Sequence, residues 1–314
     1  MTTKILITGA AGMVGQELVS LLDEIGGHDV LATDLREPSS LPASVRFRKM
    51  DITTEDPALI VAEEKPDVII HLASIVNPPK GSGRALAFAV DVEGTRKILE
   101  AAIQHKVRRF VVTSSGAAYG YHADNPVPLQ ETDALRGNPE FAYADHKRLV
   151  EEMLAEYRKS HPALEQVIFR VGTVLGKGTE NQITALFHRK KLLGIQGSES
   201  PFVFIWTRDL ARILARAIAQ GPAGIFNVAG DGTMGLTDLA RVLNKPVLRL
   251  PAWGLKGALA FAKPFRLSQY GPEQVGFLQY RPVLDNRALK EEFGYIPQKS
   301  SEEVFEFWRQ GAGL

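Results

Sequence analysis

The stretch ITGAAGMVGQELVSLLDE at residues 7–24 decides the fold, because it joins a strand, a glycine turn and a helix. The run that enters the glycines is β-branched and apolar, which is typical of a buried parallel strand, and the residues after them are apolar at helical spacing. Gly9 allows a sharp turn, Gly12 lets phosphates approach the backbone, and Gly15 lets the helix pack closely. The pattern predicts a phosphate site at the start of the helix.

An acidic residue ends the next predicted strand. Residues 28–33 are again β-branched and apolar, and Asp34 follows them, 19 residues after Gly15. A carboxylate at this place accepts hydrogen bonds from the hydroxyls of an adenosine ribose and repels a 2′-phosphate. Arg36, two residues on, has a guanidinium of the kind that pairs with such a phosphate. We expect a dinucleotide site that takes NAD in preference to NADP.

The same alternation of strands and helices continues along the chain. Further strands are expected at 45–49, 68–73 and 109–114, with helices near 56–64 and 84–104. This order predicts an α/β fold, namely a Rossmann doubly wound parallel sheet with a smaller, discontinuous substrate-binding lobe. We divide the chain into a dinucleotide-binding domain and a substrate-binding lobe, with the bounds 1–171 plus 207–244 and 172–206 plus 245–314.

Composition excludes several classes of function. The chain has 314 residues with 37 basic and 36 acidic side chains, a net charge of +1 and no long block of one sign, so nucleic acid is not an expected partner. Cysteine is absent, which rules out disulfides and thiol chemistry, and no signal segment or transmembrane segment is recognised. We expect a homodimer in the cytoplasm that acts on a small molecule.

The seven histidines show no paired spacing with acids, so we expect no metal site. His122 follows a predicted strand end and is a candidate for contact with the substrate. A solvent-exposed loop histidine is the alternative interpretation.

A tyrosine and a lysine four residues apart are the candidate catalytic groups. Tyr143 and Lys147 fall on one face of a predicted helix, and the sequence Thr113-Ser114-Ser115 lies at the carboxyl end of a predicted strand, where open α/β sheets bind ligands. The ammonium of Lys147 is expected to lower the pKa of the Tyr143 phenol, so that the phenol exchanges a proton at neutral pH. An ordinary helix surface is the structural alternative.

In these segments the chain resembles the extended short-chain dehydrogenases/reductases, a family that includes nucleotide-sugar epimerases and dehydratases. The matching segments follow the family order: GAAGMVG at 9–15, DLR at 34–36, DI at 51–52, HLAS at 71–74, DVEGT at 91–95, SSGAAYG at 114–120, YADHK at 143–147, FRVGTVLG at 169–176 and DLARILARAI at 209–218. The resemblance implies hydride transfer to or from a nicotinamide with a catalytic set of Ser115, Tyr143 and Lys147.

The resemblance also implies the cofactor contacts. Asp51 and Ile52 would flank the adenine, and Lys147 would hold the nicotinamide ribose. The other implied contacts lie in the matching segments and are Gly9, Gly12, Met13, Val14, Gly15, Asp34, Arg36, Leu72, Ala73, Ser74 and Tyr143.

Departures from the family pattern bear on the reaction. Sugar-nucleotide dehydratases have an Asp-Glu pair after the catalytic threonine, whereas Gly116 and Ala117 stand here, which argues against dehydration. Asp91 stands where the family commonly has Asn, and an acid at this place can still accept the same backbone donors.

The arginines with which epimerases bind a substrate diphosphate are displaced as well. Their positions fall on Phe202 and on the segment 272–275, which reads Pro-Glu-Gln-Val. This loss argues for another substrate, because paired arginine contacts are the basis of tight phosphate binding. Arg208 and Arg281 are the candidates to substitute from neighbouring positions.

An apolar stretch at 252–267 has three possible roles. It contains Trp253, Phe261, Phe265 and Leu267 and is too short to span a bilayer. Core packing is the first expectation, the lining of an apolar substrate pocket the second, and contact with a membrane surface through a face flanked by lysines the third.

Three functions are compatible with the sequence. The first is an NAD-dependent oxidoreductase acting on a secondary alcohol or ketone with net redox change. The second is a nucleotide-sugar 4-epimerase of the UDP-glucose 4-epimerase kind, which returns the hydride and keeps its NAD. The third is a non-catalytic NAD sensor, against which the presence of both Tyr143 and Lys147 counts.

Overall fold

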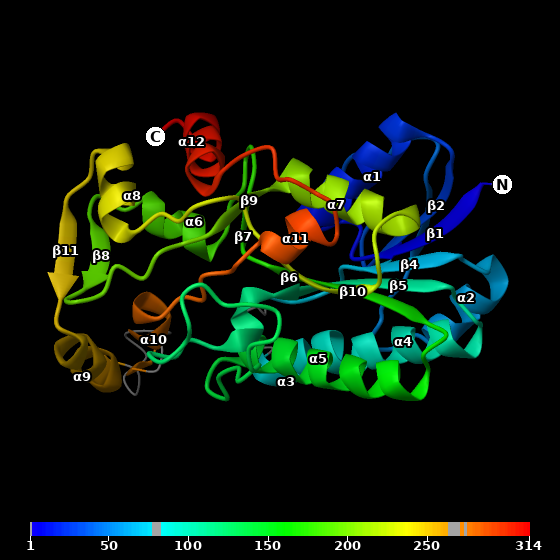
Figure 1. The fold of residues 1–314 in the computed structure, drawn as a ribbon, viewed down its shortest axis with the longest axis horizontal. Helices are drawn as coiled ribbons and strands as arrows, with labels where there is room; N and C mark the ends of the chain where they lie inside the picture. Colours follow the sequence, from blue (N-terminus) through cyan, green and yellow to red (C-terminus); the bar gives the residue numbers. More distant parts are fainter. Residues whose placement is uncertain (1, 77–82, 263–270, 273–274) are drawn as a thin grey trace.

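A large parallel sheet with helices on both faces occupies one end of the molecule, and smaller strands and helices occupy the other (Figure 1). The computed structural model describes residues 2–76, 83–262, 271–272 and 275–314. Within the described residues, seven parallel strands form the main sheet in the order β10-β6-β5-β4-β1-β2-β3. The order reverses between β1 and β4, which is the point where doubly wound sheets bind ligands. The predicted fold class is confirmed.

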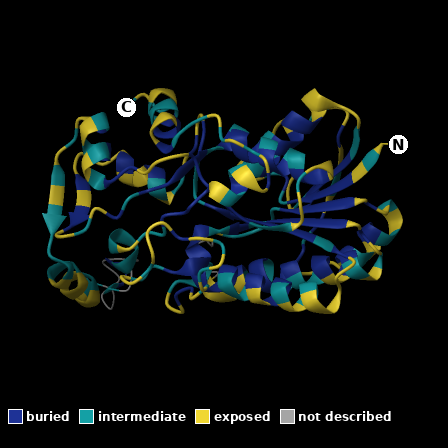
Figure 2. Ribbon diagram, viewed as in Figure 1, coloured by how far each residue is buried: buried dark blue, intermediate teal, exposed yellow. Residues whose placement is uncertain are grey.

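Apolar runs in the sequence account for the buried strands of this sheet. Ile5, Leu6 and Ile7 of β1 are almost completely buried, and so are Ile69 and Ile70 of β4 (Figure 2). The strand bounds are β1 (Thr3–Thr8), β2 (His28–Asp34), β3 (Arg46–Lys49), β4 (Val68–His71), β5 (Arg109–Ser115), β6 (Glu165–Val171) and β10 (Gly224–Val228).

Two layers of helices cover the sheet and form a separate apolar cluster on each face. Helices α1 (Met13–Ile25) and α7 (Thr207–Ala219) pack together on one face. The other face carries α2 (Pro57–Glu64), α4 (Thr95–Gln104) and α5 (Ala142–Ser160). Short helical elements join these layers: α3 (Gly83–Phe88), the π-helical turn η1 (Ala89–Gly94) and the 3-10 helix η2 (Gly116–Tyr119).

The second lobe contains short strands and helices around an aromatic core. Strand β7 (Thr173–Leu175) pairs with β9 (Phe204–Trp206), and β8 (Leu192–Ile195) pairs with β11 (Val247–Leu250). The helices of this part of the chain are α6 (Gln182–Phe187), α8 (Leu236–Leu243), α9 (Ala252–Ala262), α10 (Val275–Gln279), α11 (Arg287–Glu291) and α12 (Ser301–Gly311).

Two segments lie elsewhere than the sequence-based division places them. Helix α8 packs on β8 and β11, because Leu239 and Leu243 are buried in the aromatic core of the second lobe. Helix α11 packs on β10 of the main sheet, where Leu289 and the following Phe293 join the core beside α7. Phe293 lies 5.2 Å from Phe169, measured between ring centroids.

Helix α9 differs most from expectation, because core packing was the first role assigned to its sequence. All of Ala252–Ala262 is described, and none of these residues is buried. The side chain of Trp253 is 80% exposed. Phe265 and Leu267, which complete the predicted apolar stretch, lie outside the described residues. No described helix has the length and apolar character needed to cross a membrane.

Candidate active site

The glycine turn between β1 and α1 is shaped by close backbone contacts. Gly9 has φ +73°, and a Cβ there would lie 2.5 Å from the backbone nitrogen of Ala73. A Cβ on Gly15 would lie 2.4 Å from the carbonyl oxygen of Gly9. Only glycine satisfies both conditions, because a side chain would push α1 away from the turn and the turn away from the β4 end. The turn and the close helix packing predicted for these two glycines are therefore present.

The amino terminus of α1 is open at Gly12. Gly12 is exposed, and a Cβ on it would meet only the carbonyl of Gly9, at 3.3 Å. In the described chain no side chain caps this helix, so the first-turn N–H groups of Met13 and Val14 are directed out of the helix end. Such an end, together with the helix dipole, attracts a phosphate group.

Asp34 lies directly beside this turn. Its Oδ2 accepts a hydrogen bond from the backbone N–H of Ala11 at 2.9 Å, and its Oδ1 accepts from that of Leu35 at 2.7 Å. These contacts hold the carboxylate at the end of β2 and leave it lone pairs for further donors. Arg36 is exposed and makes no hydrogen bond or ion pair with any residue that the structure describes.

The remaining predicted cofactor contacts follow β3 and β4. Asp51 accepts from the backbone N–H of Thr53 at 2.9 Å and from its hydroxyl at 2.6 Å, and the hydroxyl bond is the main cause that lowers the pKa of Asp51. Ile52 is buried against Gly94. Leu72, Ala73 and Ser74 form the partly buried segment that leaves the carboxyl end of β4.

The serine, tyrosine and lysine of the predicted catalytic set lie together at the carboxyl end of β5. Ser115 ends β5, its Oγ accepts a hydrogen bond from the backbone N–H of Ala117 at 3.1 Å, and its hydroxyl is near enough to the Tyr143 phenol to lower the phenol pKa. The Nζ of Lys147, one turn further along α5, lies 5.7 Å from the centroid of the Tyr143 ring and donates to the carbonyl oxygen of Thr113 at 2.9 Å. Ser114 is buried and bonds to Glu151 instead.

The pKa values of these groups differ from the sequence-based expectation. Burial raises the pKa of Tyr143 to about 12, the nearby Ser115 hydroxyl opposes this shift, and the charge of Asp91 adds to it. Burial lowers the pKa of Lys147, and the charges of Asp91 and Glu151 oppose that shift. The lowering of the Tyr143 pKa that the sequence predicts is therefore not found in this structure, because burial is the dominant effect.

Comparison with known proteins shows the family to which the chain belongs. The model of the NAD-dependent epimerase/dehydratase family matches residues 5–229. The chain belongs to this family. The resemblance seen in the sequence is confirmed, and NAD is the cofactor of the family.

Two bacterial proteins of similar sequence are described by their identity and coverage. An uncharacterised protein of Mycobacterium tuberculosis is 23% identical over 316 residues, which covers 99% of this chain and 84% of that protein. An uncharacterised epimerase/dehydratase of Staphylococcus haemolyticus is 35% identical over 118 residues, 36% of this chain and 37% of that protein.

Two solved structures share the fold over nearly all of the chain. UDP-glucose 4-epimerase of Thermotoga maritima, with UDP-glucose, has a TM-score of 0.76 at 21% identity and covers 99% of both chains. The enzyme WbmG of Bordetella bronchiseptica, in complex with NAD, has a TM-score of 0.77 at 19% identity and covers 100% of this chain and 94% of that one.

Two residues of this family member that were expected to contact substrate are engaged elsewhere. Arg208, at the start of α7, pairs with Glu17 at 3.0 Å and with Glu24, both on α1, so the structure does not bring it to Tyr143. The physical reason is that α7 packs against α1, on the opposite face of the sheet from α5. His122 lies near the site, but its Nε2 is hydrogen-bonded to the carbonyl oxygen of Gly137 at 2.8 Å.

An aromatic group next to Tyr143 was missed by the sequence analysis. The ring centroid of Phe141 lies 6.2 Å from that of Tyr143 and 4.2 Å from that of Phe277 on α10. Tyr121 contacts Phe277 edge-on, with the ring centroids 4.6 Å apart. Tyr121 and Phe141 stand within a few residues of the motifs SSGAAYG and YADHK, which is a signal that could have identified them, whereas nothing in the sequence places Phe277 here.

Arg281 completes this side of the site. Its guanidinium carbon lies 3.9 Å from the centroid of the Phe202 ring, and Nη1 donates to the carbonyl oxygen of Ser200 at 2.7 Å. In the described part of the chain it has no ion-pair partner. Burial lowers the pKa of Arg281 to about 10, and the nearby Tyr121 opposes this shift.

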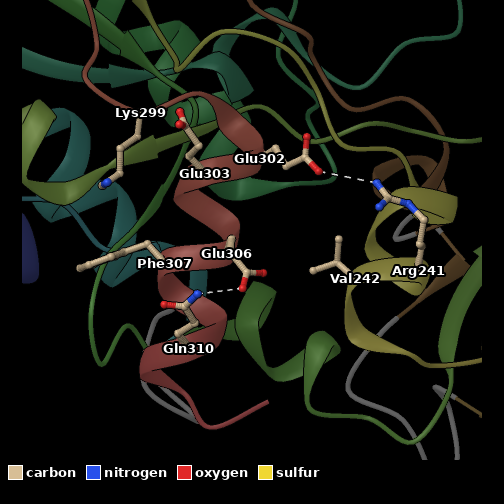
Figure 3. A pocket seen from close by; sticks show the side chains of 8 residues that line it. All are labelled: Arg241, Val242, Lys299, Glu302, Glu303, Glu306, Phe307 and Gln310. Atoms are coloured by element: carbon tan, nitrogen blue, oxygen red, sulfur yellow. Dashed lines mark hydrogen bonds and ion pairs between the residues drawn. The ribbon is translucent and has the colours of Figure 1, made fainter.

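A surface hollow of about 620 Å³ between α8 and α12 is not part of this site (Figure 3). Three glutamates, an arginine and a lysine are among its eight lining residues, and Glu302 pairs with Arg241 at 3.6 Å. None of the predicted site residues lines it.

Proposed function

We propose that this protein is an NAD-dependent oxidoreductase that moves a hydride between NAD and a secondary alcohol or ketone. The observation that carries the proposal is that Ser115, Tyr143 and Lys147 lie together at the carboxyl end of β5, with the Lys147 Nζ 5.7 Å from the centroid of the Tyr143 ring. This edge also holds the glycine turn and the segment after β4. A proton-exchanging phenol beside a dinucleotide site is what this reaction requires.

The residues of the proposed cofactor site suit NAD. The open end of α1 at Gly12 would hold the pyrophosphate on its free N–H groups. Gly9 and Gly15 make this possible, because a Cβ at either position would collide with neighbouring backbone and distort the turn. Asp34 would bind the adenosine ribose, with Asp51 and Ile52 beside the adenine, and would disfavour the 2′-phosphate of NADP. When bound, NAD supplies the hydride acceptor and the positive charge of its oxidised ring.

Tyr143 would serve as the proton donor and acceptor for the substrate oxygen. With a pKa of about 12 the phenol is protonated at neutral pH, which suits donation to a ketone oxygen during reduction. Ser115 would share that oxygen through its hydroxyl and hold it against the phenol. For oxidation the phenol pKa must fall, and positive charge close to the ring has that effect. Lys147 is the residue of this chain placed to provide such charge.

The test is a substrate screen with two readouts. The purified protein is supplied with NAD and with secondary alcohols, sugar acids or UDP-sugars, and NADH absorbance and product identity are both recorded. The proposal predicts NADH formation in proportion to ketone product for one class of alcohol. Turnover that persists after all bound and added NAD has been removed would contradict it.

A nucleotide-sugar 4-epimerase is the second candidate, and Arg281 favours it. The family resemblance expects a diphosphate-binding arginine at the position of Phe202, and the guanidinium of Arg281 lies on the face of that ring. The positive charge is thus supplied from another position in the chain, which weakens the argument against sugar nucleotides. Formation of a sugar isomer without accumulation of NADH identifies this reaction. Arg281→Met should then raise the KM for the UDP-sugar.

A further inference from the structure

A buried carboxylate connects the segment after β4 with helix α5. Asp91 lies in the π-helical turn η1, is 2% exposed and uses both of its oxygens. Its Oδ1 accepts from the hydroxyl of Ser74 at 2.9 Å and from the backbone N–H of Ile75 at 2.8 Å. Its Oδ2 lies 3.2 Å from Nδ1 of His146. One side chain therefore joins the predicted cofactor segment to the helix that carries Tyr143.

His146 makes a polar contact in the core that an apolar side chain could not make. It is completely buried, directly precedes Lys147 on α5, and contacts the ring of Phe88 edge-on. Because a carboxylate only accepts hydrogen bonds, the Nδ1 facing Asp91 must carry the proton. Among the residues that the structure describes, the buried Nε2 has no hydrogen-bond partner, and an unpaired buried nitrogen costs stability. An apolar side chain would avoid that cost, so packing alone does not explain a histidine at this position.

The charge of Asp91 reaches both groups of the proposed chemistry. It raises the pKa of Lys147, against the effect of burial, and it also raises the pKa of Tyr143. A neutral amide of the same shape would keep an acceptor for the Ile75 N–H but would lose this charge. The acid at position 91 thus combines a mechanical contact with an electrostatic one.

The other charged groups around Lys147 are accounted for. Glu151, one turn further along α5, also raises the pKa of Lys147 but is itself paired with Arg170 at 2.7 Å. His71 of β4 faces Lys147, and burial lowers its pKa to about 3, so it stays neutral in any assay near neutral pH. The other charged contacts between described residues of α5 and the helices around it are Arg84 with Asp145, Arg148 with Asp145 and Glu152, and Tyr157 with Glu100, and none of them involves Lys147.

We propose that Asp91 and His146 form a positioning pair, which ties the segment after β4 to α5 and holds Lys147 beside Tyr143. This inference rests on the proposed function and on the contact between Lys147 and the nicotinamide ribose that the family resemblance implies. Neither residue touches the reacting atoms, so the pair acts through Lys147. Its effect must appear in NADH binding, through the pH at which Lys147 loses its charge or through the affinity below that pH.

The test uses NADH binding, which needs no substrate. NADH is titrated into the protein at a series of alkaline pH values, and binding is followed by NADH fluorescence. Loss of the Lys147 proton in this pH range weakens binding. Asp91→Asn should move the midpoint of this loss to lower pH by about half a unit or more, because the charge that stabilises the ammonium is gone. Lys147→Met should abolish the pH step and confirms the group that is observed.

Variants at His146 separate positioning from folding. His146→Asn keeps an N–H at the place of Nδ1 and should retain the wild-type midpoint and NADH affinity. His146→Leu removes the donor but leaves the charge of Asp91, so it should weaken NADH binding below the alkaline step without lowering the midpoint as Asp91→Asn does. A lower melting temperature with an unchanged midpoint in Asp91→Asn, or with unchanged NADH affinity in His146→Leu, would overturn the proposal. Failure of the proposed function is recognised separately, as full turnover of Tyr143→Phe.

Discussion

The glycine turn before α1 and the helix α9 are both rich in glycine and alanine, yet their surroundings are opposite. A Cβ on Gly15 would collide with the backbone of the turn, whereas a Cβ on Gly257 of α9 would meet nothing within 4 Å. Leu18 and Leu22 of α1 are buried, and no residue of α9 is. The comparison teaches that the dinucleotide side of the molecule is set by close backbone packing, while this part of the second lobe presents apolar side chains outward.

Removing a charged partner should show the largest difference in stability between the dinucleotide side and the second lobe. Glu151 and Arg170 are almost completely buried, so Glu151→Gln leaves the arginine without its counter-charge and should cost about 3 to 5 kcal/mol of unfolding free energy. Glu302→Gln in the second lobe is the matched control and should have little effect, since both members of the Arg241–Glu302 pair are mostly exposed. Urea unfolding measures both, and equal losses would break the comparison.

Adding one methyl group at each glycine is the next test. Gly15→Ala should destabilise the protein by about 1 to 3 kcal/mol, because the rigid turn cannot move away from the new Cβ. Gly257→Ala should be neutral or stabilising by up to about 1 kcal/mol, since alanine is the better helix former and the space is open. Thermal unfolding of the two variants is sufficient, and a stable Gly15→Ala protein would contradict the packing described for the turn.

Asp34 gives a smaller effect that is confined to binding. Asp34→Ala should weaken NAD by about 1 to 3 kcal/mol through loss of ribose hydrogen bonds, and it should favour NADP relative to NAD. Calorimetric titration of both cofactors into the wild type and the variant measures the change. Tighter binding of NADP than of NAD by the wild-type protein would refute the role given to this carboxylate.

The smallest effect is expected at Trp253. Because its side chain is 80% exposed, Trp253→Ser should change the unfolding free energy by no more than about 0.5 kcal/mol. A loss of several kcal/mol, measured by urea unfolding, would show that the tryptophan is buried in solution.

Local signals in the sequence were sufficient for the dinucleotide side. The turn at Gly9 and Gly15, the acid at the end of β2 and the spacing of Tyr143 and Lys147 all depend on residues close together in the chain, and periodicity identifies these elements. The position of Ser115 at the carboxyl end of a strand was predictable for the same reason, because the run 109–114 has the apolar pattern of a strand.

Contacts between distant segments were not predictable in this way. His146 meets Asp91 only because α5 packs against η1, and Arg281 reaches Phe202 only after the second lobe has folded. The sequence predicts a substrate contact for Arg208, whereas in the structure its side chain pairs with Glu17 of α1. Which neighbouring element a helical side chain faces depends on how the helix packs, and local sequence does not show this. The apolar composition of α9 predicted burial, but composition carries no information about which surface is available to cover a helix.

The most direct test of the central claim is the turnover of Tyr143→Phe on a substrate that the wild-type protein converts. The substitution keeps the ring and its contacts with Phe141 but removes the phenol oxygen. The account predicts that turnover falls by about a hundredfold or more, the usual effect of losing a general acid and base, while NADH still binds with wild-type affinity. Near wild-type turnover by this variant would contradict the claim that Ser115, Tyr143 and Lys147 carry the chemistry.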